Sequence, residues 1–231
     1  IDPDARRHIA ELPLMGLTML TPRRRPPAAL PDDGQRPVVF VHGMGGHRGN
    51  FTPMQLWLRV RGRRRLYGVG LEPGLSVEAL GVQLSAFIDE VLEVNGLPAS
   101  ARVDLVAHSM GGLVARCALE CPATAERVAT LVTLGTPHGG TYAARYGGTR
   151  HTLALRPDSE LMRGLSRQVP WRLPTRLVGF WSRADVLLLP ARTACLDGAE
   201  NHELDSLTHY GYLLRPSCWR SVEEALSGSG R

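Results

Sequence analysis

Short, continuous apolar runs recur along the chain and are separated by longer segments in which apolar residues return every three or four positions. A continuous run of four to eight apolar residues is typical of a strand buried on both faces of a sheet. Residues 37–41 form such a run, and further mostly apolar segments predict strands at 65–69, 103–107, 128–134 and 176–181 and a short sixth at 194–199.

The segments between these runs carry helical spacing. The clearest example is 76–94, where Ser76 is a favourable N-cap and Asn95-Gly96 is a typical helix end. Further helices are predicted at 51–60, from about 110 to Cys121, at 158–168 and at 219–226. Strands thus alternate with helices, which predicts the α/β class, with a mostly parallel central sheet and helices on both faces.

The first 36 residues differ from the rest, being rich in Pro and Arg and only weakly periodic. We expect residues 1–36 to be an extension that packs on the domain or stays partly loose, with a short strand or turn within 9–20 and a loop from 21 onwards. Residues 37–231 are expected to form a single catalytic domain, in which 141–175 is a possible short cap.

Composition narrows the range of partners. The 231 residues suit one domain, which we expect to be a monomer, and no apolar run approaches the length of a membrane span.

The net charge is +5 and all 27 basic residues are Arg. Two clusters, at 23–25 and 61–65, lack interleaved aromatic residues, so we expect solvated surface arginines and no nucleic-acid partner.

The strongest chemical signal is Ala107-His108-Ser109-Met110-Gly111-Gly112, which lies between a predicted strand and a predicted helix. A nucleophilic serine in a strained strand-to-helix turn needs small residues two positions before and two positions after it, because the two backbones crowd together there. Ala107 and Gly111 fill those positions. Ser109 is therefore the candidate nucleophile.

A second motif, His42-Gly43-Met44-Gly45-Gly46, follows the first predicted central strand. Acyl transfer places negative charge on the carbonyl oxygen, and backbone N–H groups stabilise that charge. We predict that the oxyanion donors are the amides of Met44, in this loop, and Met110, the residue after the nucleophile.

A serine nucleophile needs a base and an orienting acid, commonly in the chain order Ser, Asp, His. Asp185 follows the strand ending at 181, where such an acid belongs; Asp197 and Asp205 are its rivals.

Only two histidines come after Asp185. His209, in a turn before the last helix, is the predicted base, and His202 is the alternative. His42 and His108 are expected to hold their loops in shape, and His138 to be structural or to line the substrate site.

The four cysteines show no metal-ligand spacing, and no metal site is predicted. Cys117 and Cys121 are expected to be thiols on one helix. Cys195 and Cys218 flank the segment that carries His209, so they are either a disulfide or a pair of buried thiols. A disulfide would require an oxidising compartment. The sequence does not decide the cellular location of the protein, but it favours export over the cytoplasm.

The motifs VFVHGMGG, VDLVAHSMGGLVAR, TLGTPHGGT, SRADVLLLP, LDGAEN and THYGYLL together resemble bacterial triacylglycerol lipases and esterases of the α/β-hydrolase superfamily. The likeness is greatest to the small lidless lipases whose strand-to-helix turn around the nucleophile has the sequence A-H-S-M-G-G. It runs from about residue 38 to 226. It implies the α/β-hydrolase fold, with Ser109, Asp185 and His209 as catalytic triad and Met44 and Met110 as oxyanion donors. The residues 1–36 have no counterpart in the smallest members of that group.

The resemblance implies a serine hydrolase that cleaves carboxylic esters of short to medium acyl chains, with an ester or lipid substrate and no cofactor. The triad fixes the chemistry but not the substrate, so a polyester hydrolase, a thioesterase, an amidase and an acyltransferase remain alternatives. A binding protein that lacks activity is disfavoured because all three triad residues are present.

Overall fold

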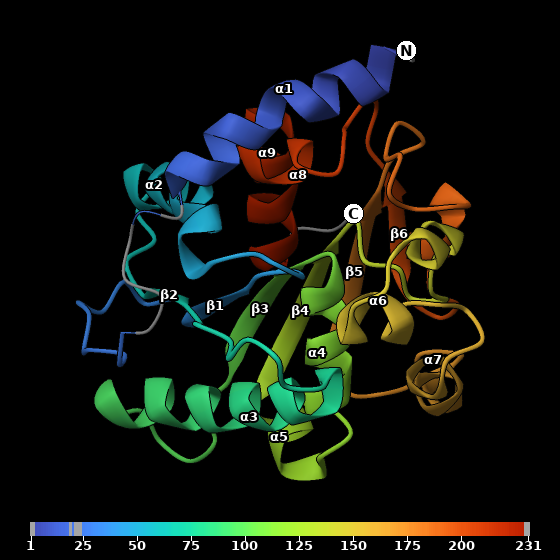
Figure 1. The fold of residues 1–231 in the computed structure, drawn as a ribbon. Helices are drawn as coiled ribbons and strands as arrows, with labels where there is room; N and C mark the ends of the chain where they lie inside the picture. The colour runs from blue at the N-terminus through green and yellow to red at the C-terminus, as the bar shows by residue number, and fades with distance from the viewer. Residues whose placement is uncertain (1–2, 19, 21–24, 229–231) are drawn as a thin grey trace.

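A computed structural model describes residues 3–18, 20 and 25–228, and its centre is one sheet of six parallel strands (Figure 1). The strand order is β2-β1-β3-β4-β5-β6, and every neighbouring pair is parallel. The strands are β1 (Val38–Val41), β2 (Leu66–Gly68), β3 (Val103–His108), β4 (Val128–Leu134), β5 (Arg176–Trp181) and β6 (Glu200–Glu203). The predicted α/β class and parallel sheet are confirmed.

Helices cover both faces of this sheet (Figure 1). The α-helices are α1 (Pro3–Thr18), α2 (Thr52–Val60), α3 (Val77–Val94), α4 (Met110–Ala118), α5 (Pro122–Glu126), α6 (Arg150–Ala154), α7 (Glu160–Leu165), α8 (Gly211–Leu214) and α9 (Pro216–Leu226). Short 3-10 helices are η1 (Arg48–Phe51), η2 (Tyr142–Tyr146), η3 (Ser166–Gln168) and η4 (Ala191–Ala194). Among the described helices, none is long and apolar enough to cross a membrane.

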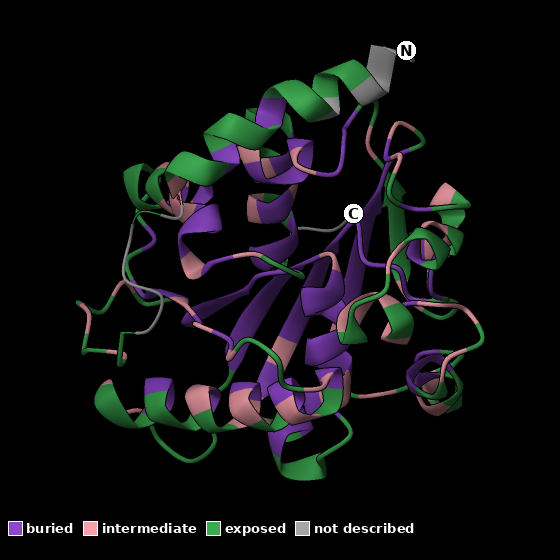
Figure 2. Ribbon diagram, viewed as in Figure 1, coloured by how far each residue is buried: buried purple, intermediate pink, exposed green. Residues whose placement is uncertain are grey.

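The core has two apolar layers, one on each side of the sheet (Figure 2). On β1, Val39 and Val41 pack into the layer shared with α3, α4 and α7, while Val38 and Phe40 pack into the layer shared with α1, α2, α8 and α9. Neighbouring side chains of a strand point to opposite faces, so both faces are apolar only when every position is apolar. This is why β1 appears as a continuous apolar run.

The predicted helix at 76–94 is present as α3, with the Ser76 side chain accepting a hydrogen bond from the Ala79 N–H. The predicted helices at 51–60 and 219–226 are α2 and α9. The helix after Ser109 stops at Ala118, and Pro122 begins α5 beyond it.

The sixth strand was expected at 194–199 but is found at Glu200–Glu203, preceded by η4. All four residues of β6 are exposed at the edge of the sheet. An edge strand buries little, so it carries no apolar signature. The more apolar residues 194–199 lie in the connection and pack beside the sheet.

The N-terminal segment is a helix and not the short strand or turn expected within 9–20. Met15 is buried in the layer below α1, and the Glu11 carboxylate is buried against the body of the protein. Pro13 inside the helix removes one backbone hydrogen bond, which weakens the local preference for a helix. Packing on the domain therefore decides the conformation. The predicted loop is present from 25 onwards, whereas residues 21–24 lie outside the described part of the chain.

The basic cluster at 61–65 is only partly solvated, contrary to expectation. Arg63 and Arg65 are buried, and Arg65 forms an ion pair with Asp32 at 2.8 Å. Burial lowers the pKa of Arg63. Asp32 and Asp33, in the loop before β1, bind residues of this cluster. The run of arginines in the sequence does not indicate these long-range contacts. Of the other cluster, Arg23 and Arg24 lie outside the described residues.

All four cysteines are free thiols, so Cys195 and Cys218 are not bridged. Cys218 is fully buried on α9 in the apolar layer beneath it, whereas Cys195 packs against the separate small cluster that contains Trp181. Burial raises the pKa of both thiols. Of the two sequence-based alternatives, the thiol pair is the one found, with Cys195 only half-buried.

Parallel pairing places the loops after β1, β3 and β5 at one edge of the sheet. Val41 pairs with Ala107, and Leu134 pairs with both His108 and Phe180. The carboxyl ends of these strands therefore lie side by side, which is where ligands bind in open α/β sheets.

Candidate active site

Ser109 occupies the sharp turn between β3 and α4 in a strained conformation, with φ of 55° and ψ of −129°. The turn is possible only because Gly111 has no side chain, since a Cβ there would lie 2.4 Å from the Val41 carbonyl oxygen. The small residue expected two positions after Ser109 is thus required by the crossing of α4 over the end of β1.

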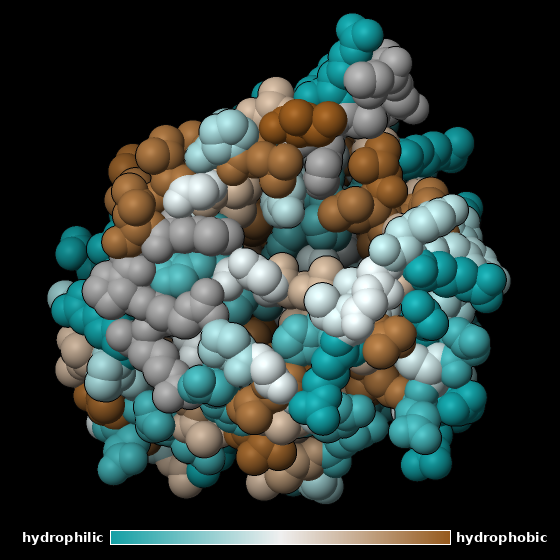
Figure 3. Space-filling view, in the orientation of Figure 1, coloured by the Kyte–Doolittle hydropathy of each residue, from teal (hydrophilic) through white to brown (hydrophobic). Residues whose placement is uncertain are grey.

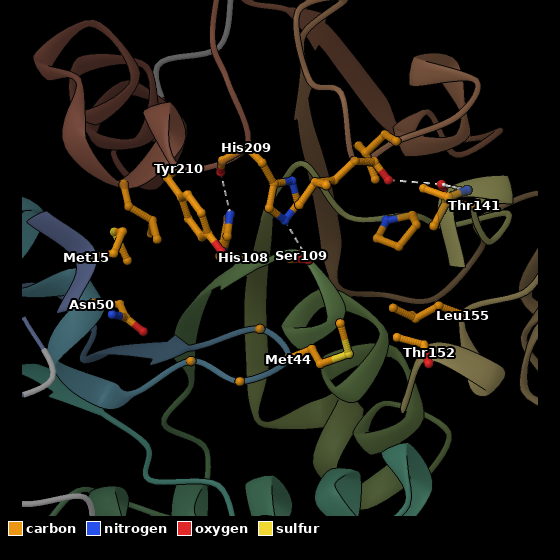
Figure 4. A pocket seen from close by; sticks show the side chains of 18 of the residues that line it. Met15, Met44, Asn50, His108, Ser109, Thr141, Thr152, Leu155, His209 and Tyr210 are labelled. Carbon is orange, nitrogen blue, oxygen red and sulfur yellow. Dashed lines mark hydrogen bonds between the residues drawn. The ribbon is translucent and has the colours of Figure 1, made fainter. Parts of the chain in front are cut away.

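Ser109, His209 and Asp185 form a hydrogen-bonded row, and Figure 4 shows its contact between Ser109 and His209. His209 Nε2 lies 2.9 Å from Ser109 Oγ, and His209 Nδ1 lies 2.8 Å from Asp185 Oδ2. The three residues come from separate elements, namely the β3–α4 turn, the loop after β5 and the loop before α8. This arrangement lets an imidazole accept the serine proton while a carboxylate orients it.

The acid is buried and fixed in its loop. Asp185 is 1% exposed, and its Oδ1 accepts the Leu187 N–H at 3.1 Å. Ser182 Oγ accepts the N–H groups of Ala184 and Leu207, at 3.3 and 3.0 Å. One hydroxyl therefore joins the loop that carries Asp185 to the segment that leads to His209.

His108 contacts His209, the predicted base, and helps to hold it in position. Its Nε2 donates to the His209 carbonyl oxygen at 2.8 Å, and the two rings are 4.7 Å apart. Burial, followed by the nearby His209, holds the pKa of His108 well below its usual value, so this ring is neutral. The expected structural role of His108 agrees with these contacts.

The loop at 42–46 lies directly against Ser109. A Cβ on Gly43 would lie 2.8 Å from Ser109 Cβ, and the loop is closed by a Gly46 N–H to Gly43 carbonyl bond of 3.0 Å. His42 Nε2 accepts the Leu71 N–H, which holds the base of the loop. Met44 lies in this loop, and Met110 is the first residue of α4, whose N–H has no carbonyl within the helix to accept it.

A cavity of about 400 Å³ opens over Ser109 and His209. Most of its lining is apolar, and among the described residues that line it none is Asp, Glu or Arg. One side is made by α1 and the other by residues 141–155 of the expected cap (Figure 4). The rest of that cap, including Leu161 and Leu165 of α7, packs into the core.

The rival residues lie elsewhere. His202 is exposed on the edge strand β6, and Asp197 and Asp205 are exposed as well. His138 is buried, with Nε2 3.2 Å from Thr133 Oγ1, and burial holds its pKa well below the usual value. It is not among the residues that line the cavity, so its surroundings agree with the structural role.

Helix α1 is the part of the site that the sequence did not indicate. Leu12, Met15 and Gly16 line the cavity. Their spacing of three and four positions is a helical signal, but Pro13 and the Arg-rich surroundings weakened it. Within the described residues, no cluster of three or more His, Cys, Asp or Glu could hold a metal ion.

Three comparisons relate the chain to known proteins. A model of the PGAP1-like alpha/beta domain family matches residues 79–150. A triacylglycerol lipase from Burkholderia plantarii is 29% identical over 150 residues, which cover 60% of this chain and 40% of the lipase. This chain therefore spans less than half the length of that relative.

Solved structures extend the similarity over most of the fold. A Bacillus licheniformis lipase in its mature form superposes with a TM-score of 0.73, 21% identity and coverage of 87% of this chain and 95% of that one. An alpha/beta hydrolase enzyme from a Mar Chica lagoon metagenome gives a TM-score of 0.60, 18% identity and coverage of 84% and 91%. These likenesses establish the shared fold.

Proposed function

We propose that this chain, which is a member of the α/β-hydrolase superfamily, hydrolyses carboxylic esters through an acyl-enzyme formed on Ser109. The observation that carries the proposal is the row from Ser109 through His209 to Asp185 at the floor of an apolar cavity. The similarity to a triacylglycerol lipase supports the same reaction class.

In the first step Ser109 Oγ attacks the ester carbonyl carbon while His209 Nε2 accepts its proton. The 2.9 Å contact between these two atoms supports that transfer. Asp185, hydrogen-bonded to Nδ1, fixes the ring so that Nε2 faces the serine, and its charge stabilises the imidazolium that forms.

The carbonyl oxygen becomes negative in the tetrahedral intermediate. We assign its stabilisation to the backbone N–H groups of Met44, in the loop at 42–46, and Met110, at the start of α4. The intermediate collapses when His209 returns its proton to the leaving alkoxide. A water molecule, deprotonated by His209, then attacks the acyl-enzyme, and His209 returns that proton to Ser109 Oγ as the acid is released.

The cavity favours esters of modest size. Its volume of about 400 Å³ is at the lower end of ordinary ligand sites, and its apolar walls suit a short or medium hydrocarbon chain. A long acyl chain would extend beyond the walls into solvent and gain less from burial.

A panel of p-nitrophenyl esters from acetate to palmitate tests the proposal. We expect the highest kcat/KM between butyrate and octanoate, and loss of nearly all hydrolysis in Ser109→Ala. His202→Ala is the matched control and should behave as the wild type, because His202 is exposed on β6. Failure of the wild type to hydrolyse any ester of the panel would refute the proposal.

A further inference from the structure

We propose that helix α1 is part of the substrate site: it forms the wall of an arm of the cavity that holds the hydrocarbon chain of the ester, either the acyl or the alkoxy chain. This inference rests on the proposed function. It adds to that function a chain-selecting element from outside the catalytic motifs.

The cavity extends from Ser109 in two directions (Figure 4). In one direction it reaches α1, where Met15 lies on the same side of Ser109 as Tyr210 and Asn50. In the other direction it reaches the cap residues Thr141, Thr152 and Leu155. An ester presents one group on each side of the carbonyl carbon, and two arms that meet at the nucleophile give each group its own place.

The arm beside α1 is apolar. Leu12 and Met15 contribute hydrocarbon from the helix, and Leu213 contributes it from α8. The polar groups on this side are the uncharged side chains of Asn50 and Tyr210 and the neutral ring of His108. Such walls stabilise a hydrocarbon chain by removing its surface from water and give little to a charged group.

Helix α1 is fastened to the rest of the site and is therefore a fixed wall. The buried carboxylate of Glu11 accepts hydrogen bonds from the Thr208 hydroxyl and from Arg215, the latter at 3.1 Å. Thr208 immediately precedes His209. At the end of α1, the Thr18 hydroxyl accepts the Asn50 side-chain N–H at 2.8 Å. The helix is thus joined to η1 and to the segment that carries His209.

The outer face of α1 remains apolar where it borders the opening. Leu12 and Leu17 are 46% and 64% exposed, and hydrophobic side chains gather along the helix above the hollow on this face (Figure 3). The wall therefore continues to the mouth of the cavity, so a chain that leaves the arm stays in contact with apolar surface.

Gly16 gives a direct way to test the wall. It lines the cavity, and a Cβ added there would have no atom within 4 Å. There is therefore room for a larger side chain at this edge of the arm without displacing the core. Replacing glycine inside a helix also stabilises the helix, so loss of folding is not expected.

The experiment compares Gly16→Phe and its control Gly16→Ala with the wild type on two series of esters. One series lengthens the acyl chain of p-nitrophenyl esters from acetate to decanoate, and the other lengthens the alcohol of alkyl acetates from ethyl to decyl. We expect Gly16→Phe to retain activity on the shortest esters. In one series its kcat/KM should fall relative to the wild type by roughly tenfold for each two methylenes that are excluded. The series affected identifies the chain that the arm holds.

Two results would overturn the inference. One is a chain-length profile for Gly16→Phe that follows the wild type in both series, and the other is a loss that is equal at every length of both series in a variant that circular dichroism shows to be folded. If the wild type hydrolyses no ester in either series, the proposed function fails before the role of α1 is tested.

Discussion

At the scale of single residues, the site depends on a backbone conformation that most amino acids avoid. Ser109 has a positive φ, which costs a few kcal/mol unless the surroundings hold it. Its N–H donates to the Leu134 carbonyl, and its own carbonyl accepts the Gly112 N–H. The strand before it and the helix after it therefore fix the hydroxyl above the sheet, facing His209.

The roles proposed for the three residues lead to a prediction about their variants. Ser109→Ala, His209→Ala and Asp185→Asn should each stay folded and lose at least about a thousandfold in kcat. Because the row acts as a unit, each double variant should lose little more than the worse of its two single variants. Additive losses, measured with p-nitrophenyl butyrate, would show that the three residues act independently.

The sequence identified these three residues through motif and chain order, and the structure places them in contact. It could not identify Glu11, because an acidic residue in a weakly periodic segment has the pattern of a surface residue. Only the fold brings Glu11 to Thr208 and Arg215, which lie about 200 positions further along the chain. Long-range polar contacts of this kind leave no local pattern.

At the scale of elements, α1 should affect catalysis through the loop of His209. Glu11→Ala should lower kcat on p-nitrophenyl acetate, the shortest acyl ester of the panel, because the segment at 208–209 loses its fixed position. It should also reduce the free energy of unfolding by about 1–3 kcal/mol.

Glu11→Gln should recover most of the kcat lost in Glu11→Ala, since its amide oxygen still accepts the Thr208 hydroxyl. Glu90→Ala, which changes an exposed residue of α3, is the matched control. If Glu11→Ala lowers the stability of the protein but leaves kcat unchanged, α1 contributes to the fold and not to catalysis.

The cap is also predicted to be fixed. The fully buried Arg116 guanidinium donates to the Leu165 carbonyl at 2.6 Å and to the His138 carbonyl at 3.1 Å, which ties the segment after 141 to α4. The Tyr142 N–H donates to the Leu189 carbonyl at 2.9 Å. We therefore expect the hydrolysis rate to rise smoothly through the solubility limit of tributyrin. A sharp increase at that limit would mean that 141–155 opens as a lid.

The elements that the sequence predicted best are those whose burial is uniform. The strands β1, β3 and β4 bury both faces and appear as apolar runs, and α3 buries one regular stripe. The sequence placed β6 incorrectly and missed α1 because each depends on a neighbour. An edge strand of exposed polar residues is defined by its pairing with β5, and α1 by its docking on the domain.

At the scale of the whole molecule, two buried histidines make stability depend on pH. Burial holds the pKa values of His108 and His138 well below 6.5, whereas both titrate near 6.5 in the unfolded chain. Below about pH 6.5 the unfolded state thus binds protons that the folded state does not, and the free energy of unfolding falls as pH falls. Each histidine contributes up to about 1.4 kcal/mol per pH unit.

Urea unfolding at pH 7.5, 6.5 and 5.5 measures this slope. His138→Gln retains a group able to bond Thr133 but cannot titrate, so its stability should fall less steeply between pH 6.5 and 5.5 than that of the wild type. Parallel curves for the two proteins would show that His138 does not contribute.

The central claim is that Ser109 is an activated nucleophile in an ester-hydrolysing site. The most direct test is to treat the folded protein with a fluorophosphonate and to measure its intact mass and peptide map. We expect one adduct per chain, located on Ser109, formed more slowly in the presence of p-nitrophenyl butyrate and much more slowly in His209→Ala. Labelling at another residue, or no labelling of folded protein, would contradict it.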